Sequence, residues 1–220
     1  MSKKERAAPA TALLLIDLQY DFCAYGTLAV PDGNAVIRVA QSLLPHFATV
    51  VATQDWHPAN HQSFAANHPW RKPGQVIDLH GLSQVLWPVH CVQNTFGAML
   101  VKPLDAQRID RVVRKGTHPE VDSYSGFFDN GRRYQTELND YLQRRGIDRL
   151  VIMGLATDYC VKYTVLDALA LGYEVSVLTD GCRAVNLVEG DDERALAEMA
   201  DAGARLTTAA AWLSSSPPVG

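Results

Sequence analysis

Three short apolar runs constrain the fold of this chain more than any other feature. Each run is nearly continuous rather than alternating, which is typical of parallel strands that are buried on both faces. The runs span Ala12–Ile16, Val50–Thr53 and Leu150–Met153, and two weaker candidates are Arg111–Arg114 and Val175–Leu178. We therefore expect a mainly parallel β-sheet whose two faces are covered by other elements.

Segments with apolar residues at helical spacing lie between these runs. They span Asn34–Phe47, Gln135–Arg145 and Asp158–Leu171, and Gly146 and Gly172 stand where helices are expected to end. Strands and helices in alternation are typical of α/β proteins, in which helices cover a parallel sheet. The sequence predicts a three-layer α/β/α fold with a mainly parallel sheet.

Composition limits the classes of protein to which the chain can belong. Its 220 residues, 47% of them hydrophobic, fit a single domain over residues 1–220. The net charge of -4 and the pI of about 5.9 argue against a nucleic-acid partner. The four cysteines are scattered, which suits reduced thiols in a cytoplasmic protein.

The sequence also predicts no membrane partner. The apolar run near the N-terminus ends at Asp17 and is shorter than the core of a signal peptide. No run reaches the roughly 18 apolar residues that a membrane span needs. Self-association stays open, and residues 211–220 read as a frayed tail.

An irregular region extends from about residue 55 to 96. It is rich in proline and glycine, and such an insertion in a compact domain is usually functional or disordered. Its tryptophans and histidines argue against disorder. Asp55 and His57 would point to one side of an extended backbone, and His90 from a distant loop would complete a site for zinc, iron or manganese. Three other residues compete as ligands: His61, His68 and Ser63.

Reactive side chains follow the predicted strands. Asp17, Asp55, Lys115 and Cys160 each come at or after a strand end, where open α/β sheets bind their ligands. Asp17 could act as a general base, and the charge of Lys115 could lower the pKa of a thiol. The alternatives without a catalytic role are that Asp17 caps a neighbouring loop and that Lys115 is a solvated lysine at a strand end.

Cys160 lies in the first turn of a predicted helix, with Thr157 or Asp158 as candidate caps. The positive end of the helix dipole would favour its thiolate, and the unpaired N–H groups could form an oxyanion hole. The competing interpretation is a buried structural cysteine.

Flat side chains accompany these residues. Phe22, Trp87 and Tyr124 follow predicted strands or lie in irregular stretches, and such rings suit a flat aromatic substrate. Packing over the edge of the sheet would explain them equally well.

Five blocks stand in a specific order along the chain: Leu15–Cys23, Thr53–Pro58, Trp87–Asn94, Lys115–Gly116 with Asp122–Phe127, and Gly154–Val161. In these blocks the sequence resembles the nicotinamidases, many of them also pyrazinamidases, of the isochorismatase-like cysteine hydrolases. The resemblance implies hydrolysis of nicotinamide or pyrazinamide through a cysteine thioester. It also implies a role in NAD salvage.

The resemblance further implies roles for individual residues. The catalytic triad would be Asp17, Lys115 and Cys160, and the oxyanion donors would be the N–H groups of Ala156 and Cys160. One divalent ion, zinc before iron or manganese, would be held by Asp55, His57 and His90. The substrate ring would bind the ion and lie among Phe22, Trp87 and Tyr124, and the Leu155–Ala156 peptide would be cis.

Other functions compete with this interpretation. A metal-free N-carbamoyl, biuret or ureido amidohydrolase would share the triad but would leave the aspartate and histidines without a role. An isochorismate-hydrolysing relative would not need the cysteine. A non-enzymatic binding module should lack a triad member, and a thiol redox protein should have a resolving cysteine nearby.

Overall fold

The fold is known from a computed structural model, which describes residues 10–102, 104 and 108–215. A six-stranded sheet in the order β5-β2-β1-β6-β7-β8 forms its centre, and all neighbouring strands are parallel. The strands are β1 (Ala10–Ile16), β2 (Val50–Asp55), β5 (Arg111–Lys115), β6 (Ile147–Leu155), β7 (Glu174–Arg183) and β8 (Arg205–Thr207). The predicted parallel sheet is confirmed, and each of the five predicted strands is longer than expected.

Burial along the strands follows their place in the sheet. From Leu13 to Ile16 every residue of the central strand β1 is 0% exposed, because neighbours flank it and both faces are covered. The edge strand β5 instead alternates at its end, where Val113 and Lys115 are buried and Arg114 is exposed. Continuous apolar runs therefore predicted the central strands well and the edge strand less clearly.

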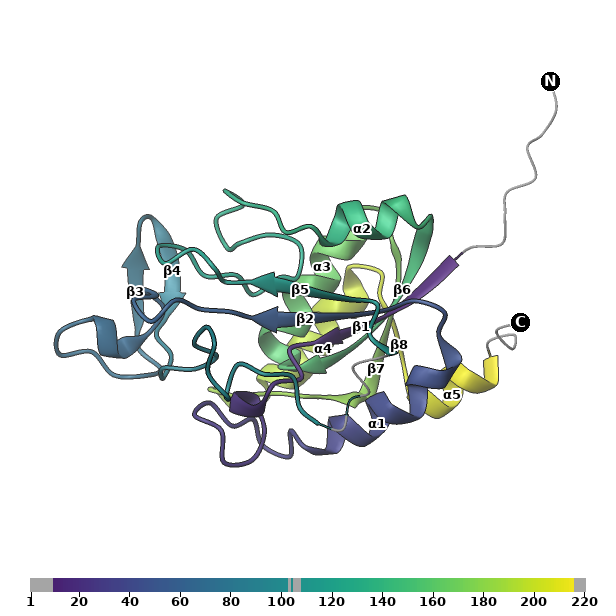
Figure 1. Cartoon of the computed structure of the whole chain (residues 1–220), viewed down its shortest axis with the longest axis horizontal. Coiled ribbons are helices and arrows are strands. Elements are labelled where there is room, and N and C mark those ends of the chain that lie inside the picture. The colour runs from purple at the N-terminus through teal and green to yellow at the C-terminus, as the bar shows by residue number, and fades with distance from the viewer. Residues whose placement is uncertain (1–9, 103, 105–107, 216–220) are drawn as a thin grey trace, which may run out of the picture.

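Helices cover both faces of the sheet, as Figure 1 shows. On one face lie α1 (Ala35–Leu43) and α5 (Ala209–Ser215), and on the other lie α2 (Leu138–Arg144), α3 (Lys162–Ala170) and α4 (Asp191–Asp201). The three-layer α/β/α prediction is confirmed. Gly146 and Gly172 have the positive φ values of 65° and 92° expected at helix ends.

Several boundaries differ from the sequence prediction. The first helix ends at Leu43 and continues as a 3₁₀ turn (Leu44–His46), because Pro45 cannot donate the next helical hydrogen bond. The sequence did not predict α4 or β8. The expected tail from residue 211 is wrong up to Ser215, which lies in α5, and residues 216–220 lie outside the described residues.

The region from residue 55 to 96 is irregular, as predicted, but it contains a hairpin of β3 (Val76–Leu79) and β4 (Leu82–Val85). His80 and Gly81 form its two-residue turn with positive φ values of 53° and 84°, as the twist of a tight hairpin requires. In Figure 1 this hairpin lies beyond the carboxyl ends of β2 and β5. The irregular region therefore covers the edge of the sheet where the predicted site residues are.

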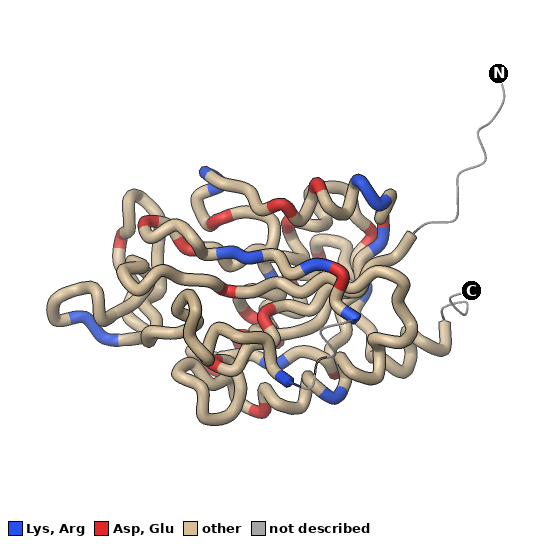
Figure 2. Tube along the Cα trace, in the orientation of Figure 1, with Lys and Arg blue, Asp and Glu red and all other residues tan. Residues whose placement is uncertain are grey.

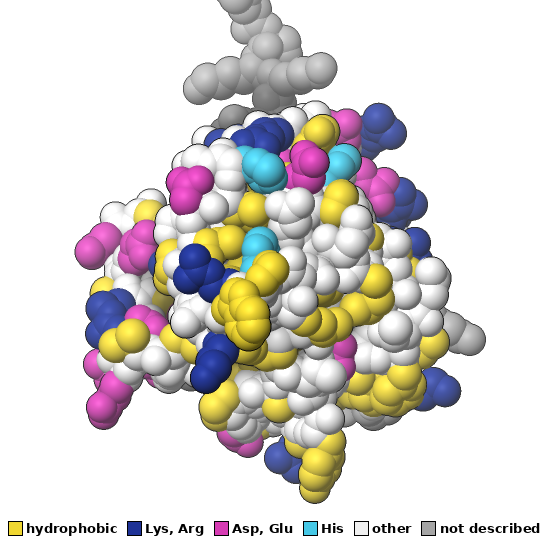
Figure 3. Space-filling view, turned by 90° about the vertical axis from the view of Figure 1, so that its left-hand side faces the viewer, with side chains coloured by type: hydrophobic (Ala, Val, Ile, Leu, Met, Phe, Trp, Pro, Cys, Tyr) yellow, Lys and Arg dark blue, Asp and Glu magenta, His cyan; other side chains and the backbone are white. Residues whose placement is uncertain are grey.

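The surface agrees with the charge expected from the sequence. Residues of both signs are spread along the described chain in Figure 2. At the end that carries the β3–β4 hairpin, Figure 3 shows hydrophobic side chains interspersed with charged residues and histidines. Within the described ranges, no helix is both long and apolar enough to cross a membrane.

Candidate active site

Lys115 is the centre of the site at the carboxyl edge of the sheet. Its ammonium, carried by the last residue of β5, is 2.9 Å from Asp17 Oδ2, 2.6 Å from Asp55 Oδ1 and 3.4 Å from Cys160 Sγ. It also donates to the carbonyl oxygen of Ser123 at 2.8 Å. The structure thus brings the four predicted strand-end residues together, because parallel strands end at the same edge.

Burial and charge oppose one another at Lys115. Its side chain is fully buried, which disfavours the ammonium, but the carboxylates of Asp17 and Asp55 more than compensate and raise its pKa well above the ordinary value. The interpretation of Lys115 as a solvated lysine is therefore wrong. A permanently charged lysine holds both carboxylates and faces the thiol.

Asp17 directly follows β1 and is held by the neighbouring strand. The hydroxyl of Thr53 donates to Asp17 Oδ1 at 2.6 Å, and the Asp17 N–H donates back to that hydroxyl at 3.1 Å. Burial raises the pKa of Asp17 above its usual range, although Lys115 and Thr53 lower it. A carboxylate with a raised pKa is a stronger base, which suits proton transfer from a neighbouring thiol.

Cys160 lies in a single π-helical turn (Thr157–Val161) between β6 and α3. No side chain caps this turn at Ala156, so neither predicted cap is correct. The carboxylate of Asp158 instead accepts hydrogen bonds from the N–H groups of Val185 and Asn186. A Thr157 side chain that capped the Cys160 N–H would have removed this group as an oxyanion donor, and the structure has no such cap.

The thiol of Cys160 is the stable form in the free protein. Burial raises its pKa well above the ordinary value, and the nearby charges of Asp17 and Asp55 add to this effect while Lys115 opposes it. The prediction that the helix terminus favours the thiolate is therefore wrong in its net effect. A hydrogen bond between the thiol and Asp17 also favours the protonated sulfur, so ionisation requires transfer of the proton to a base.

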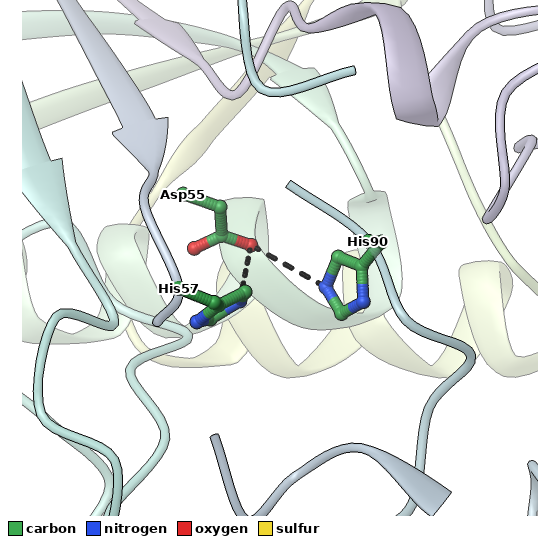
Figure 4. Close-up of side chains that lie close together, drawn as sticks. All are labelled: Asp55, His57 and His90. Carbon is green, nitrogen blue, oxygen red and sulfur yellow. Dashed lines mark ion pairs between the residues drawn. The ribbon is translucent and has the colours of Figure 1, made fainter. Parts of the chain in front are cut away.

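Asp55, His57 and His90 form a buried group around one small volume (Figure 4). Asp55 Oδ2 is 3.5 Å from His57 Nε2 and 3.9 Å from His90 Nε2. Burial opposes ionisation of Asp55, but Lys115 and the two histidines hold its pKa below the usual range. Burial and the charge of His57 lower the pKa of His90 to about 4, so this ring is neutral near pH 7.

The histidine tautomers suit a metal ion. His57 Nδ1 is 2.8 Å from the carbonyl oxygen of Gly116, and His90 Nδ1 is 2.8 Å from that of Pro88. A carbonyl only accepts, so each Nδ1 carries a proton, and Nε2, which faces Asp55, is the nitrogen that each ring can offer to a metal ion. Although burial opposes it, the carboxylate of Asp55 raises the pKa of His57, so binding of an ion there displaces the proton from Nε2. Two imidazole nitrogens and one carboxylate oxygen match the donor sets of zinc, iron and manganese.

Gly116 is required for this arrangement. A Cβ atom there would lie 2.4 Å from His57 Cε1, and the Gly116 φ of +63° is itself rarely adopted by other residues.

The sequence offered three further residues as possible ligands: His61, His68 and Ser63. His68 is turned to other partners, since its Nε2 lies 2.7 Å from the Gln62 carbonyl oxygen. His61 and Ser63 do lie beside the group, with the rings of His61 and His57 4.3 Å apart.

A pocket with an empty volume of about 380 Å³ opens beside Cys160 and the metal group. The three predicted aromatic residues, Phe22, Trp87 and Tyr124, line it as expected. The sequence did not indicate four further lining residues, which come from separate loops: Leu28, Asp122, Tyr159 and Val185. Ala156 and Cys160 lie at the same wall, and the Leu155–Ala156 peptide is cis as predicted.

Gln19 and Asp21 are buried polar residues that position the site, and neither was among the predicted site residues. The side-chain amide of Gln19 donates to the Asp55 carbonyl at 2.8 Å and accepts from the Asp55 N–H at 2.8 Å, which fixes the end of β2. Asp21 Oδ2 accepts from the N–H of Cys91 at 2.7 Å and so holds the residue after His90. The sequence feature that could have revealed Gln19 and Asp21 is their place just after an apolar strand, close to Asp17, where a polar side chain needs a partner.

Similarity to known proteins agrees with this site. Residues 11–211 match the isochorismatase domain family. The nicotinamidase of Escherichia coli (strain K12) is 56% identical over 211 residues, which cover 93% of this chain and 97% of that protein. The solved Acinetobacter baumanii nicotinamidase and pyrazinamidase has a TM-score of 0.90 at 40% identity, covering 93% of this chain and 99% of the other.

A second similar solved structure was determined with a metal ion. The pyrazinamidase of Pyrococcus horikoshii, solved in complex with zinc, has a TM-score of 0.73 at 37% identity, covering 91% of this chain and 99% of the other. The resemblance inferred from the five sequence blocks is thus confirmed. Together with the sheet and the thiol, lysine and carboxylate group at its edge, these matches show that the chain belongs to the isochorismatase family.

Proposed function

We propose that this protein is a metal-dependent nicotinamidase, which hydrolyses nicotinamide to nicotinate and ammonia. One observation carries the proposal. Lys115 contacts Cys160, Asp17 and the metal-group residue Asp55 at once, and the aromatic pocket lies directly beside them. The rings of Phe22, Trp87 and Tyr124 that line this pocket suit a small flat amide. The names of the relatives in Escherichia coli and Acinetobacter support the same substrate, and pyrazinamide is a second one.

In the first half of the reaction Cys160 is the nucleophile. Asp17 takes the thiol proton as the sulfur forms a bond with the amide carbon, and Lys115 stabilises the negative charge that stays in the buried site. The resulting oxyanion is bound by the N–H groups of Ala156 and Cys160. Collapse of this intermediate breaks the C–N bond, ammonia leaves with the proton from Asp17, and a thioester remains.

In the second half water replaces sulfur. Asp17, again a carboxylate, takes a proton from water as its oxygen attacks the thioester carbon. The C–S bond breaks, the proton on Asp17 returns to Cys160, and the acid leaves as nicotinate after its own proton passes to solvent. One buried aspartate therefore acts alternately as base and acid, which requires the raised pKa that its burial produces.

Asp55, His57 and His90 would hold one divalent ion, and zinc fits this donor set. When bound, the ion would act as a Lewis acid that takes the ring nitrogen of the substrate and fixes the ring. Phe22, Trp87 and Tyr124 would then flank the ring and exclude water from the amide.

Removal of the ion is expected to abolish turnover. Ammonia release from nicotinamide should fall to background after treatment with a strong chelator, and it should return when zinc, manganese or iron(II) is added back. Metal content is measured on the same samples by mass spectrometry. Full activity at negligible metal content would contradict the proposal and would favour an N-carbamoyl or ureido substrate.

The pH dependence should report Asp17. The mechanism needs its carboxylate, and burial raises its pKa, so kcat/KM should rise with pH through a value above the usual aspartate range of about 3.5–4. The profile is measured with excess metal, so that loss of the ion at low pH does not produce the same limb. A profile that is flat down to the ordinary range would argue against Asp17 as the base.

A further inference from the structure

His61 has an unusual position beside the metal group. It is 0% exposed, its ring is 4.3 Å from that of His57, and its Nε2 has no hydrogen-bond partner among the described residues. A buried ring with one unpaired nitrogen needs a partner, because an unsatisfied polar atom is costly away from water.

The tautomer of His61 follows from a backbone contact. The N–H of Ser63 donates to His61 Nδ1 at 3.2 Å, and the Ser63 hydroxyl lies 2.7 Å from the same nitrogen. A backbone N–H only donates, whereas a hydroxyl can rotate to donate as well. His61 Nδ1 is therefore the acceptor, and in the neutral ring the proton is on Nε2.

This tautomer is the reverse of that of the two metal-binding histidines. His57 and His90 place Nδ1–H against carbonyl oxygens and leave Nε2 with a lone pair. His61, which lies beside His57 and near Asp122, instead carries its proton on Nε2, and a protonated nitrogen cannot coordinate a metal ion. The backbone contacts thus leave His57 and His90 able to bind a metal ion through Nε2 and make His61 a hydrogen-bond donor.

The neighbouring acidic group does not form a second metal site. His57, His61 and Asp122 also lie close enough to hold an ion, with ligand atoms within 4.8 Å of one another. However, His57 has only its Nε2 lone pair available, and that atom already faces Asp55. One lone pair serves one ion, so the two groups of residues cannot be filled together.

Asp122 supplies the complementary acceptor. Its carboxylate is buried and accepts from the Ser123 N–H at 2.8 Å and from Gln84 Nε2 at 3.0 Å, and each oxygen retains acceptor capacity. No direct hydrogen bond joins it to His61 among the described residues. Polar groups at such a separation are commonly bridged by a water molecule.

We propose that His61 is a hydrogen-bond donor to a water molecule in the coordination shell of the metal, not a metal ligand, and that Asp122 accepts a hydrogen bond from the same water. His61 is thus a positioning residue that acts on the ion through this water. The inference rests on the proposed metal site of Asp55, His57 and His90. Outer-shell partners of this kind typically change metal affinity by about 10–100-fold.

Nitrogen NMR of the zinc-loaded protein with ¹⁵N-labelled histidine tests the tautomer directly. His57 and His90 are expected to show zinc-bound Nε2 and protonated Nδ1. His61, assigned by its loss in His61→Gln, should show protonated Nε2 and unprotonated Nδ1. A zinc-bound nitrogen on His61 would overturn the inference, and a purely structural role of His61 would not produce the expected pattern.

Zinc affinity, measured by competition with a chelator, separates donor from ligand. His61→Leu, which cannot donate, should weaken zinc binding about 10–100-fold, whereas His61→Gln should retain more affinity through its amide N–H. His57→Gln serves as the ligand-loss reference and should weaken binding much more. His68→Gln is the matched control from the same loop and should bind as the wild type does. Equal losses in His61→Leu and His57→Gln would contradict the donor role.

Failure of the metal site has a different signature. If the wild-type protein bound no stoichiometric zinc and the signals of His57 and His90 did not respond to it, the proposed metal site itself would be refuted, and this inference with it. If zinc binds and supports turnover but His61 coordinates it, only the inference is refuted.

Discussion

Replacement of Cys160 with alanine is expected to lower kcat for ammonia release by about 10⁴-fold or more, because no other group in the pocket can form the thioester. The side chain loses only its sulfur, and Cys160 is not one of the proposed ligands Asp55, His57 and His90. Zinc content and nicotinamide binding, measured by mass spectrometry and calorimetry, should therefore change little.

The matched control for this variant is Cys182→Ala. Cys182 is also buried, and burial raises the pKa of its thiol to about 12, but it does not line the pocket. Its kcat should stay near that of the wild type. Substantial ammonia release by Cys160→Ala would refute the thioester mechanism, and equal losses in both variants would indicate damage to the core instead.

Replacement of Lys115 with methionine is expected to affect stability and turnover together. It leaves Asp17 and Asp55 buried without their shared cation, and loss of one partner from a buried ion pair typically costs about 3–5 kcal/mol. The free energy of unfolding should fall by about that amount in denaturant titrations of the metal-free protein. Turnover should fall by about 10²-fold or more, because the negative charge that moves between sulfur and carboxylate is no longer stabilised.

Lys162→Met is the control for this effect. Lys162 pairs with Glu198 at 3.1 Å, but the Glu198 side chain is 53% exposed. Such a pair contributes at most about 1 kcal/mol, so stability and turnover should hardly change. The double variant Lys115→Met with Asp17→Asn should recover part of the lost stability, because it removes one uncompensated charge. If Lys115→Met were as stable as Lys162→Met, the central role of Lys115 would be wrong.

The sheet was predictable because its central strands are buried on both faces. A run such as Leu13–Ile16 can only be explained by an apolar environment on every side, and this fixes the strand and its place near the middle. The short strand β8 (Arg205–Thr207) and the hairpin of β3 and β4 gave no such signal, since their residues are partly exposed. β8 pairs with β7, which lies far from it in sequence, whereas β3 and β4 pair with each other across a two-residue turn.

The chemistry of the site was predictable in its residue types but not in its protonation. Position at strand ends was enough to expect Asp17, Lys115 and Cys160 at one edge of the sheet. The expectation of a thiolate was wrong, because the sequence indicated only the helix dipole, whose positive end lowers the pKa of a nearby thiol. Burial and the two carboxylates, which raise the pKa of Cys160, arise only when β2, β1 and β6 lie side by side.

The sequence by itself therefore determined the layers, the family and the reactive groups, since these depend on local pattern and on the order of short blocks. The tertiary structure alone decided how each group is protonated and what each histidine does. His57, His61 and His90 have the same side chain, and a carbonyl or an N–H contact sets which nitrogen carries the proton. The contact of His57 reaches Gly116 across 59 residues of sequence, a separation that only packing of the folded chain can fix. The contacts of His61 and His90 reach Ser63 and Pro88, two residues away, and depend on the backbone conformation that the folded loop imposes.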